Sequence, residues 1–196
     1  MIFRKGMKVL DLGAAPGSWS LGAAERVGAQ GKVLACDIQS TVTVFPPNVE
    51  FHQEDVFQRS EAFERQLAET GPFHVVMSDM APQTTGTKFT DQARSLELCL
   101  EALAVAEKYL VKGGSFVVKI FMGPDVGELL KGMRPRFARV TSFKPQSSRV
   151  GKQRNRFRRA WALRGKRRTA PGIDCSRGPG YDPLLCLKVW RRPDPD

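Results

Sequence analysis

The stretch Asp11-Leu12-Gly13-Ala14-Ala15-Pro16-Gly17-Ser18-Trp19 decides the fold class of this 196-residue chain. It follows residues 7–12, which have the pattern of a buried strand, and it leads into residues 19–27, which have the pattern of a helix. Small residues in such a turn allow the backbone to approach a ligand closely. Open α/β sheets bind ligands at this edge, beyond the carboxyl ends of their strands. The stretch therefore predicts an α/β fold with a ligand site directly after its first strand.

The glycine spacing in this turn distinguishes between classes of ligand. A dinucleotide site requires a G-x-G-x-x-G pattern, which Gly13 and Gly17 do not supply. Asp11, beside the turn, suits a cationic ligand better than a pyrophosphate. S-adenosylmethionine, which carries a sulfonium and an amino group, is a ligand of this kind. The alternative is a tight turn from strand to helix that binds no ligand.

Strands and helices alternate along the first 143 residues, which predicts one Rossmann-like α/β domain with a mostly parallel sheet and helices on both faces. The predicted helices are residues 19–27, 60–69 and 90–110, and Gly113-Gly114 supplies a stop after the last of them. The predicted strands are residues 7–12, 33–37, 49–52, 73–78, 115–120 and 140–143. From Gly165 onward Pro, Gly and Arg dominate, so we predict an irregular end. We place the boundary after residue 149: an α/β domain of residues 1–149 and a basic, irregular segment of residues 150–196.

The charge of the chain is concentrated in its last quarter. The whole sequence has 31 Lys and Arg against 20 Asp and Glu, a net charge of +11, and such a balance suggests a polyanionic partner, most often nucleic acid. Residues 150–196 contribute +9 of this charge, with 13 basic and 4 acidic residues. The first 149 residues are therefore nearly neutral.

The cysteines and the hydropathy pattern exclude several classes of protein. Cys36, Cys99, Cys175 and Cys186 form no C-x-x-C pair, so we expect reduced thiols and no metal site. No apolar run approaches the roughly 20 residues that cross a bilayer, and the start of the chain lacks the apolar stretch of a signal peptide. We expect a cytoplasmic monomer that has no membrane partner.

Four further residues stand where predicted strands end. Asp37 ends the second strand, about 20 residues after the glycine turn, where an acid can bind ribose hydroxyls. Asp55 follows the third strand, where it can accept a hydrogen bond from an adenine amino group. Asp79 follows the fourth strand within Ser78-Asp79-Met80-Ala81-Pro82. Lys119 lies near the end of the fifth, within Ser115-Phe116-Val117-Val118-Lys119-Ile120-Phe121.

With the motifs at residues 11–19, 78–82 and 115–121 in this order, the chain resembles the FtsJ/RlmE-like family of ribosomal RNA 2′-O-ribose methyltransferases over residues 3–149. The resemblance implies that residues 1–149 are a methyltransferase domain of Rossmann-like fold, with S-adenosylmethionine as cofactor and a uridine ribose of large-subunit ribosomal RNA as substrate. It implies that Gly17 and Trp19 bind the methionine end of the cofactor, that Asp37 binds the ribose and Asp55 the adenine, and that Asp79 also contacts the cofactor. Asp79 and Lys119 would be two members of a Lys-Asp-Lys-Glu catalytic set.

In that set Lys119 is the general base that takes the 2′-hydroxyl proton, and Asp79 orients it. Methyl transfer to a ribose hydroxyl gains from positioning and from removal of this proton. Apolar surroundings weaken proton binding by a lysine, whereas a neighbouring carboxylate strengthens it. The sequence leaves this balance open, and it also leaves open that Lys119 is a strand-end lysine in solvent.

Two members of the catalytic set have no match in this chain. The family carries its first lysine upstream of the first strand, and we expect that segment to be missing here because Met1 lies almost on the strand. The glutamate position falls on Asn155, and no acid occurs between Arg149 and Asp174. The alternative function is therefore a catalytically impaired RNA-binding protein of the same fold that keeps the cofactor site.

The basic tail has two competing interpretations. One is a change of reading frame after about Arg149, because Arg156-Phe157-Arg158-Arg159 would bury unpaired guanidinium groups if it formed the family's last strand. The other is a basic arm that binds RNA phosphates, with Phe157 and Trp161 stacking on unpaired bases.

Overall fold

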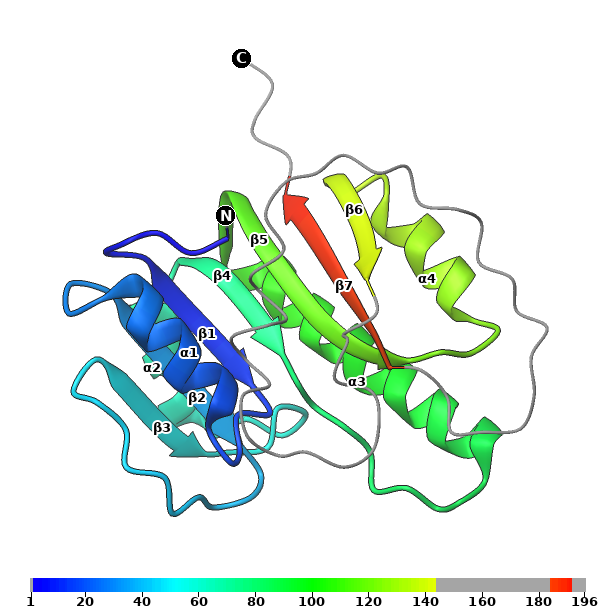
Figure 1. Ribbon diagram of the computed structural model, residues 1–196, viewed down its shortest axis with the longest axis horizontal. Helices are drawn as coiled ribbons and strands as arrows, with labels where there is room; N and C mark the ends of the chain where they lie inside the picture. Colours follow the sequence, from blue (N-terminus) through cyan, green and yellow to red (C-terminus); the bar gives the residue numbers. More distant parts are fainter. Residues whose placement is uncertain (1, 144–183, 192–196) are drawn as a thin grey trace.

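The computed structural model describes residues 2–143 and 184–191, and these form one seven-stranded sheet with helices on both faces (Figure 1). The strand order is β3-β2-β1-β4-β5-β7-β6. β7 runs antiparallel to both of its neighbours, whereas the pairs among β1 to β5 are parallel. The predicted Rossmann-like architecture, a mostly parallel sheet with helices on both faces, is confirmed. The segment 150–183, including Asn155, Phe157 and Trp161, lies outside the described residues.

Most elements lie where the hydrophobic pattern predicts them. The first half contains β1 (Lys8–Leu12), α1 (Ser18–Val27), β2 (Lys32–Asp37), β3 (Val49–Gln53), α2 (Glu61–Thr70) and β4 (Phe73–Ser78). The second half contains α3 (Lys88–Tyr109), β5 (Leu110–Phe121), α4 (Val126–Met133), β6 (Phe137–Phe143) and β7 (Leu184–Arg191).

Two hydrophobic clusters hold the helices against the sheet. One joins α2, α3 and α4 to the sheet and includes Phe63, Phe73 and Phe116, all fully buried. The other joins α1 and the N-terminal residues Ile2 and Phe3 to the opposite face. Because side chains alternate along β5, with Phe116, Val118 and Ile120 in the first cluster, Lys119 points to the face that α1 covers.

Two predictions about the elements were wrong, and one helix was missed. The end of the chain is not irregular throughout, because Leu184–Arg191 forms β7 between β5 and β6. Gly113-Gly114 does not separate the last helix from the next strand: β5 begins at Leu110 and passes through both glycines, where its pairing with β4 shifts register. Helix α4 was not predicted, although Val126, Leu129 and Met133 are buried at helical spacing.

No helix among the described residues is long and apolar enough to cross a membrane.

Candidate functional site

The carboxyl ends of β1, β2, β4 and β5 meet at one edge of the sheet and hold most of the predicted site residues. β1 lies between β2 and β4, so the order of strands reverses at this point, and open α/β sheets bind ligands in the crevice beside such a reversal. Asp11 lies on β1, Asp37 ends β2, and Asp79 directly follows β4. The topology therefore brings together acids that are far apart in the sequence.

The turn after β1 is held by hydrogen bonds and by close packing. The amides of Gly13 and Ala14 both donate to the carbonyl oxygen of Cys36, at 2.9 and 3.0 Å. Gly13 has a φ of 76°, and a Cβ there would lie 2.6 Å from Cγ of Met80 and 2.7 Å from its amide nitrogen. Gly17 has a φ of 117°, and a Cβ there would lie 2.8 Å from the ring of Phe45. At both positions the loops of the protein itself already require glycine.

Asp37 connects the turn after β1 to the loop after β2. Its Oδ2 accepts a hydrogen bond from the amide of Ala15 at 2.8 Å, and its Oδ1 accepts one from the amide of Gln39 at 2.8 Å. The hydroxyl of Thr41 donates to the carbonyl oxygen of Pro16 at 3.1 Å and closes the same loop over the turn. Each carboxylate oxygen of Asp37 keeps a second lone pair with which to accept a hydrogen bond.

Asp79 and Lys119 form the contact at the centre of this edge. The parallel register pairs Ser78 with Val118, which brings the next residues of the two strands side by side. Nζ of Lys119 donates to the backbone oxygen of Asp79 at 2.8 Å and forms an ion pair with its Oδ1. The lysine side chain is 16% exposed, so it is not the solvated strand-end lysine of the alternative interpretation. Burial raises the pKa of Asp79, and the charge of Lys119 opposes that rise.

Asp11 is the most strongly perturbed acid of the site. Its side chain is completely buried, and its Oδ2 accepts a hydrogen bond from the hydroxyl of Ser20 at 2.6 Å. Its Oδ1 accepts no hydrogen bond from the described part of the chain. Burial raises the pKa of Asp11 to about 7, the Ser20 hydrogen bond opposes that rise, and the charges of Asp79 and Asp37 add to it.

Two predicted residues lie farther from this contact. Asp55 follows β3, and its Oδ1 accepts a hydrogen bond from the amide of Phe57 at 2.8 Å, which fixes the local turn. Trp19 is half-buried on α1 and packs against the hydrophobic cluster on that face of the sheet. The structure thus joins Asp79 to Lys119 directly and Asp37 to the turn after β1, whereas no contact within the described residues joins Asp55 to either group.

The acids of this edge fit a cationic ligand. The charges of Asp79 and Asp37 raise the pKa of Asp11, and among the described residues Lys119 forms an ion pair with Asp79. A positive charge placed here would favour the ionised carboxylates, whereas a pyrophosphate would repel them. No group of three or more His, Cys, Asp or Glu residues with metal-binding geometry occurs in residues 2–143 and 184–191.

Comparison with known proteins assigns the family. The family model described as "FtsJ-like methyltransferase" matches residues 1–157. The chain belongs to the FtsJ-like methyltransferase family. It is 76% identical over 149 residues to the Ribosomal RNA large subunit methyltransferase E of Nitratidesulfovibrio vulgaris, a match that covers 76% of this chain and 74% of the relative. The protein of the same name from Lawsonia intracellularis is 66% identical over 149 residues, with the same two coverages.

Solved structures agree with this fold. A Plasmodium falciparum protein described as a ribosomal RNA methyltransferase aligns with 96% of this chain and 88% of its own, with a TM-score of 0.70 and 21% identity. A SAM-dependent O-methyltransferase of Thermotoga maritima aligns with 98% of this chain and 62% of its own, with a TM-score of 0.53 and 14% identity. The predicted class of enzyme, an FtsJ-like methyltransferase with S-adenosylmethionine as cofactor, is confirmed.

The sequence alone drew attention to Asp11 but not to its full burial. Its signal was visible, because Asp11 is the one charged residue among apolar residues at the end of the first strand. The roles of Met80 and Phe45, which approach the glycines of the turn, had no local signal in the sequence. Both residues come from loops that follow other strands and reach the turn only in the folded chain.

Proposed function

We propose that this FtsJ-like methyltransferase transfers a methyl group from S-adenosylmethionine to the 2′-hydroxyl of a uridine ribose in large-subunit ribosomal RNA. The observation that carries the proposal is the contact between Lys119 and Asp79 at the carboxyl edge of the sheet. Two relatives that are 76% and 66% identical are both named Ribosomal RNA large subunit methyltransferase E, which supports ribosomal RNA of the large subunit as substrate.

The geometry of Lys119 suits a general base. As a base Lys119 acts in its neutral form, which follows the loss of one ammonium proton to solvent and has two N–H bonds and one lone pair. The backbone oxygen and Oδ1 of Asp79 can accept both N–H bonds, which leaves the lone pair for the proton of the substrate. The ribose oxygen would bond to the methyl group as the bond between that group and sulfur breaks and leaves its electron pair on sulfur. The hydroxyl proton passes to Nζ of Lys119, and the ammonium ion that forms is stabilised by the Asp79 carboxylate.

The cofactor supplies an electrophilic methyl group on a sulfonium. Gly17 and Trp19 would lie at its methionine end, Asp37 would accept hydrogen bonds from its ribose hydroxyls, Asp55 would bind its adenine amino group, and Asp79 would lie near its positive charge. The lone pairs that remain on the carboxylate of Asp37, and the negative charge of the acids at this edge, support a ligand that brings hydrogen-bond donors and positive charge.

The general base is tested by Lys119→Arg. Arginine keeps the positive charge beside Asp79, but it does not act as a base because its pKa lies above 12. We expect methyl transfer to unmodified large ribosomal subunits to fall roughly 100- to 10,000-fold, the range for loss of a general base, while the affinity for the cofactor stays unchanged. Lys131→Arg, on the exposed surface of α4, is the matched control and keeps full activity.

The product identifies the methylated atom. A 2′-O-methyl group protects the adjacent phosphodiester from alkaline hydrolysis, so the modified RNA should leave one resistant dinucleotide, whereas a methylated base leaves none. Full activity of the Lys119→Arg variant would contradict the assignment of the base. Tight binding of cofactor and RNA without any transfer by the wild type would instead support the alternative, an impaired RNA-binding protein.

A further inference from the structure

Large apolar side chains stand exposed around the carboxyl edge of the sheet. Among the described residues, five of the seven such side chains lie at this edge: Ile38, Val42, Val44, Phe57 and Phe89. The first four belong to the loops after β2 and β3, on the side where Asp37 and Asp55 would hold the cofactor. Phe89 alone of the five lies on the other side of the Asp79–Lys119 contact, in the first turn of α3, and it is 72% exposed.

The position of Phe89 follows from the way α3 is attached to β5. The amide of Phe121, at the end of β5, donates to the hydroxyl of Ser95 at 3.0 Å, and the side-chain amide of Gln92 donates to the carbonyl oxygen of Met122. Phe89 precedes Ser95 by six residues, which is about 9 Å of helix rise. The ring therefore stands beyond the end of the strand that carries Lys119, and Figure 1 shows the first turns of α3 extending past that end.

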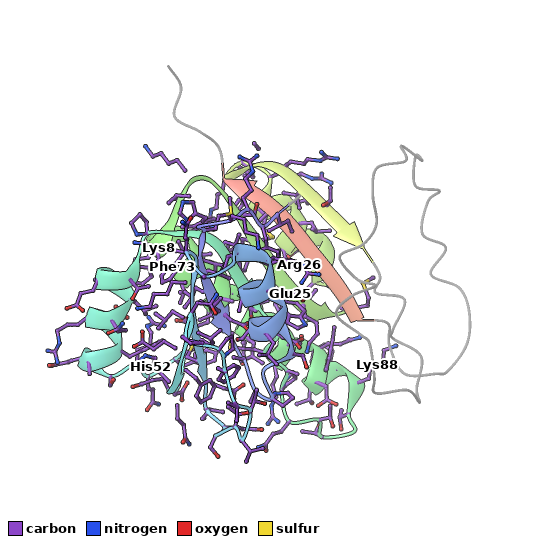
Figure 2. The ribbon with its side chains drawn as sticks, turned by 60° about the vertical axis from the view of Figure 1, so that its left-hand side comes forward. Lys8, Glu25, Arg26, His52, Phe73 and Lys88 are labelled. Carbon is purple, nitrogen blue, oxygen red and sulfur yellow. The ribbon has the colours of Figure 1, made fainter. Side chains whose placement is uncertain are left out.

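The start of α3 is held by hydrogen bonds to its loop, and two of its exposed side chains are cationic. The amide and the hydroxyl of Thr85 both donate to Oδ1 of Asp91, at 2.7 and 2.9 Å, so the carboxylate of this turn is directed to the loop. Lys88 and Arg94 are exposed on the same two turns, and Figure 2 labels Lys88 at this end of the helix. An exposed aromatic ring with two cations on the same turns of a helix suits a nucleic acid, which offers a base to the ring and phosphates to the cations.

We propose that Phe89 is a positioning residue that stacks on an unpaired base next to the methylated ribose. The inference rests on the proposed function, since it requires an RNA strand at Lys119. Single-stranded RNA is bound by aromatic stacking because every base has a π face. A stacked neighbour fixes the sugar–phosphate backbone on one side of the reacting ribose, which brings the 2′-hydroxyl to the lysine at a lower entropic cost.

The experiment compares Phe89→Leu, Phe89→Ala and Phe89→Trp in the full chain. The probe is a set of single-stranded RNA dodecamers, each carrying the fluorescent base 2-aminopurine at a different position, because stacking on an aromatic ring quenches this base. We expect quenching at one position with the wild type and with Phe89→Trp, and no quenching with Phe89→Leu. Loss of one stacked base should raise the Kd for RNA about 5- to 150-fold. Leu100→Ala, an exposed apolar residue farther along α3, is the matched control and binds like the wild type.

The outcomes separate this inference from the proposed function. Wild-type affinity and quenching in the Phe89→Leu variant overturn the role of Phe89, even if the enzyme methylates RNA. Equal losses in Leu100→Ala and Phe89→Ala also overturn it, because they indicate a general apolar surface such as a protein contact. Quenching that depends on Phe89, together with no methyl transfer to unmodified large ribosomal subunits, supports stacking on RNA and refutes the proposed function. Methyl transfer with a raised KM for RNA and a lowered kcat in Phe89→Leu supports both, because loss of positioning slows the reaction of bound RNA.

Discussion

Replacement of Asp11 by asparagine should change how the stability of the protein depends on pH. The buried carboxyl of Asp11 has a pKa of about 7 in the folded protein, against 3.8 for an ordinary aspartate. Between these values the folded state holds a proton that the unfolded chain has lost, so the free energy of unfolding falls as pH rises. The contribution of this bound proton to the free energy of unfolding is complete below pH 3.8 and is lost as the pH passes through about 7. The asparagine side chain does not titrate, so the Asp11→Asn variant lacks this part of the pH dependence.

The magnitude follows from the two pKa values. Each pH unit between them corresponds to about 1.4 kcal/mol, so the two units from pH 5 to pH 7 give about 3 kcal/mol. For a protein of this size 1 kcal/mol shifts Tm by about 2–4 °C. Between pH 5 and pH 8 the wild type should therefore lose roughly 6–12 °C of Tm relative to Asp11→Asn. Any constant cost of the new buried amide cancels, because only the difference between the two pH values is compared.

Thermal unfolding followed by circular dichroism at pH 5 and pH 8 measures this difference. Ser20→Ala provides a second test, since loss of the hydroxyl that stabilises the carboxylate should move the transition to higher pH. Asp91→Asn is the control: hydrogen bonds from Thr85 lower the pKa of Asp91, so its titration lies below this pH range. If the Tm difference between the wild type and Asp11→Asn is the same at both pH values, the assignment of a protonated, buried Asp11 is refuted.

Two further changes test the packing of the turn and of the helices. Gly13→Ala should destabilise the protein by about 2–4 kcal/mol, because the cost of a positive φ adds to that of a clash with the loop after β4. The control is Gly86→Ala, which has a φ of 82° and open space around it and should cost only about 1 kcal/mol in urea unfolding. Equal losses of stability in the two variants would argue against the clash. Glu64 accepts hydrogen bonds from Lys108, Tyr109 and Arg59, which lower its pKa to about 2. Glu64→Gln should therefore lower the free energy of unfolding by about 1 kcal/mol at pH 7, a modest value because the carboxylate is partly exposed. This cost should shrink as the pH falls from 4.5 toward 2. A loss of stability that does not depend on pH would indicate packing instead.

Local patterns in the sequence predicted the elements that local physics specifies. The strands that end at or near Asp11, Asp37 and Asp79 are short apolar runs bounded by turn residues, and the structure contains each of them. The same approach missed helix α4, since eight residues between a Gly-Pro turn and a run of arginines and prolines are too few to stand out by periodicity. It also missed the strand Leu184–Arg191, because the surrounding Pro, Gly and Arg residues concealed eight residues of strand-like composition.

From the sequence we predict β1 to β6 and the first three helices in their order, the glycine turn after the first strand, and an acid or a lysine near five strand ends. Which of these residues meet depends on the folded chain. The register of β4 with β5 brings Asp79 to Lys119, and the strand order brings Asp37 and Asp79 near Asp11. The physical reason is that periodicity and turn chemistry act over a few neighbouring residues. Strand order, burial and the resulting shifts in pKa depend instead on residues that are distant in the chain.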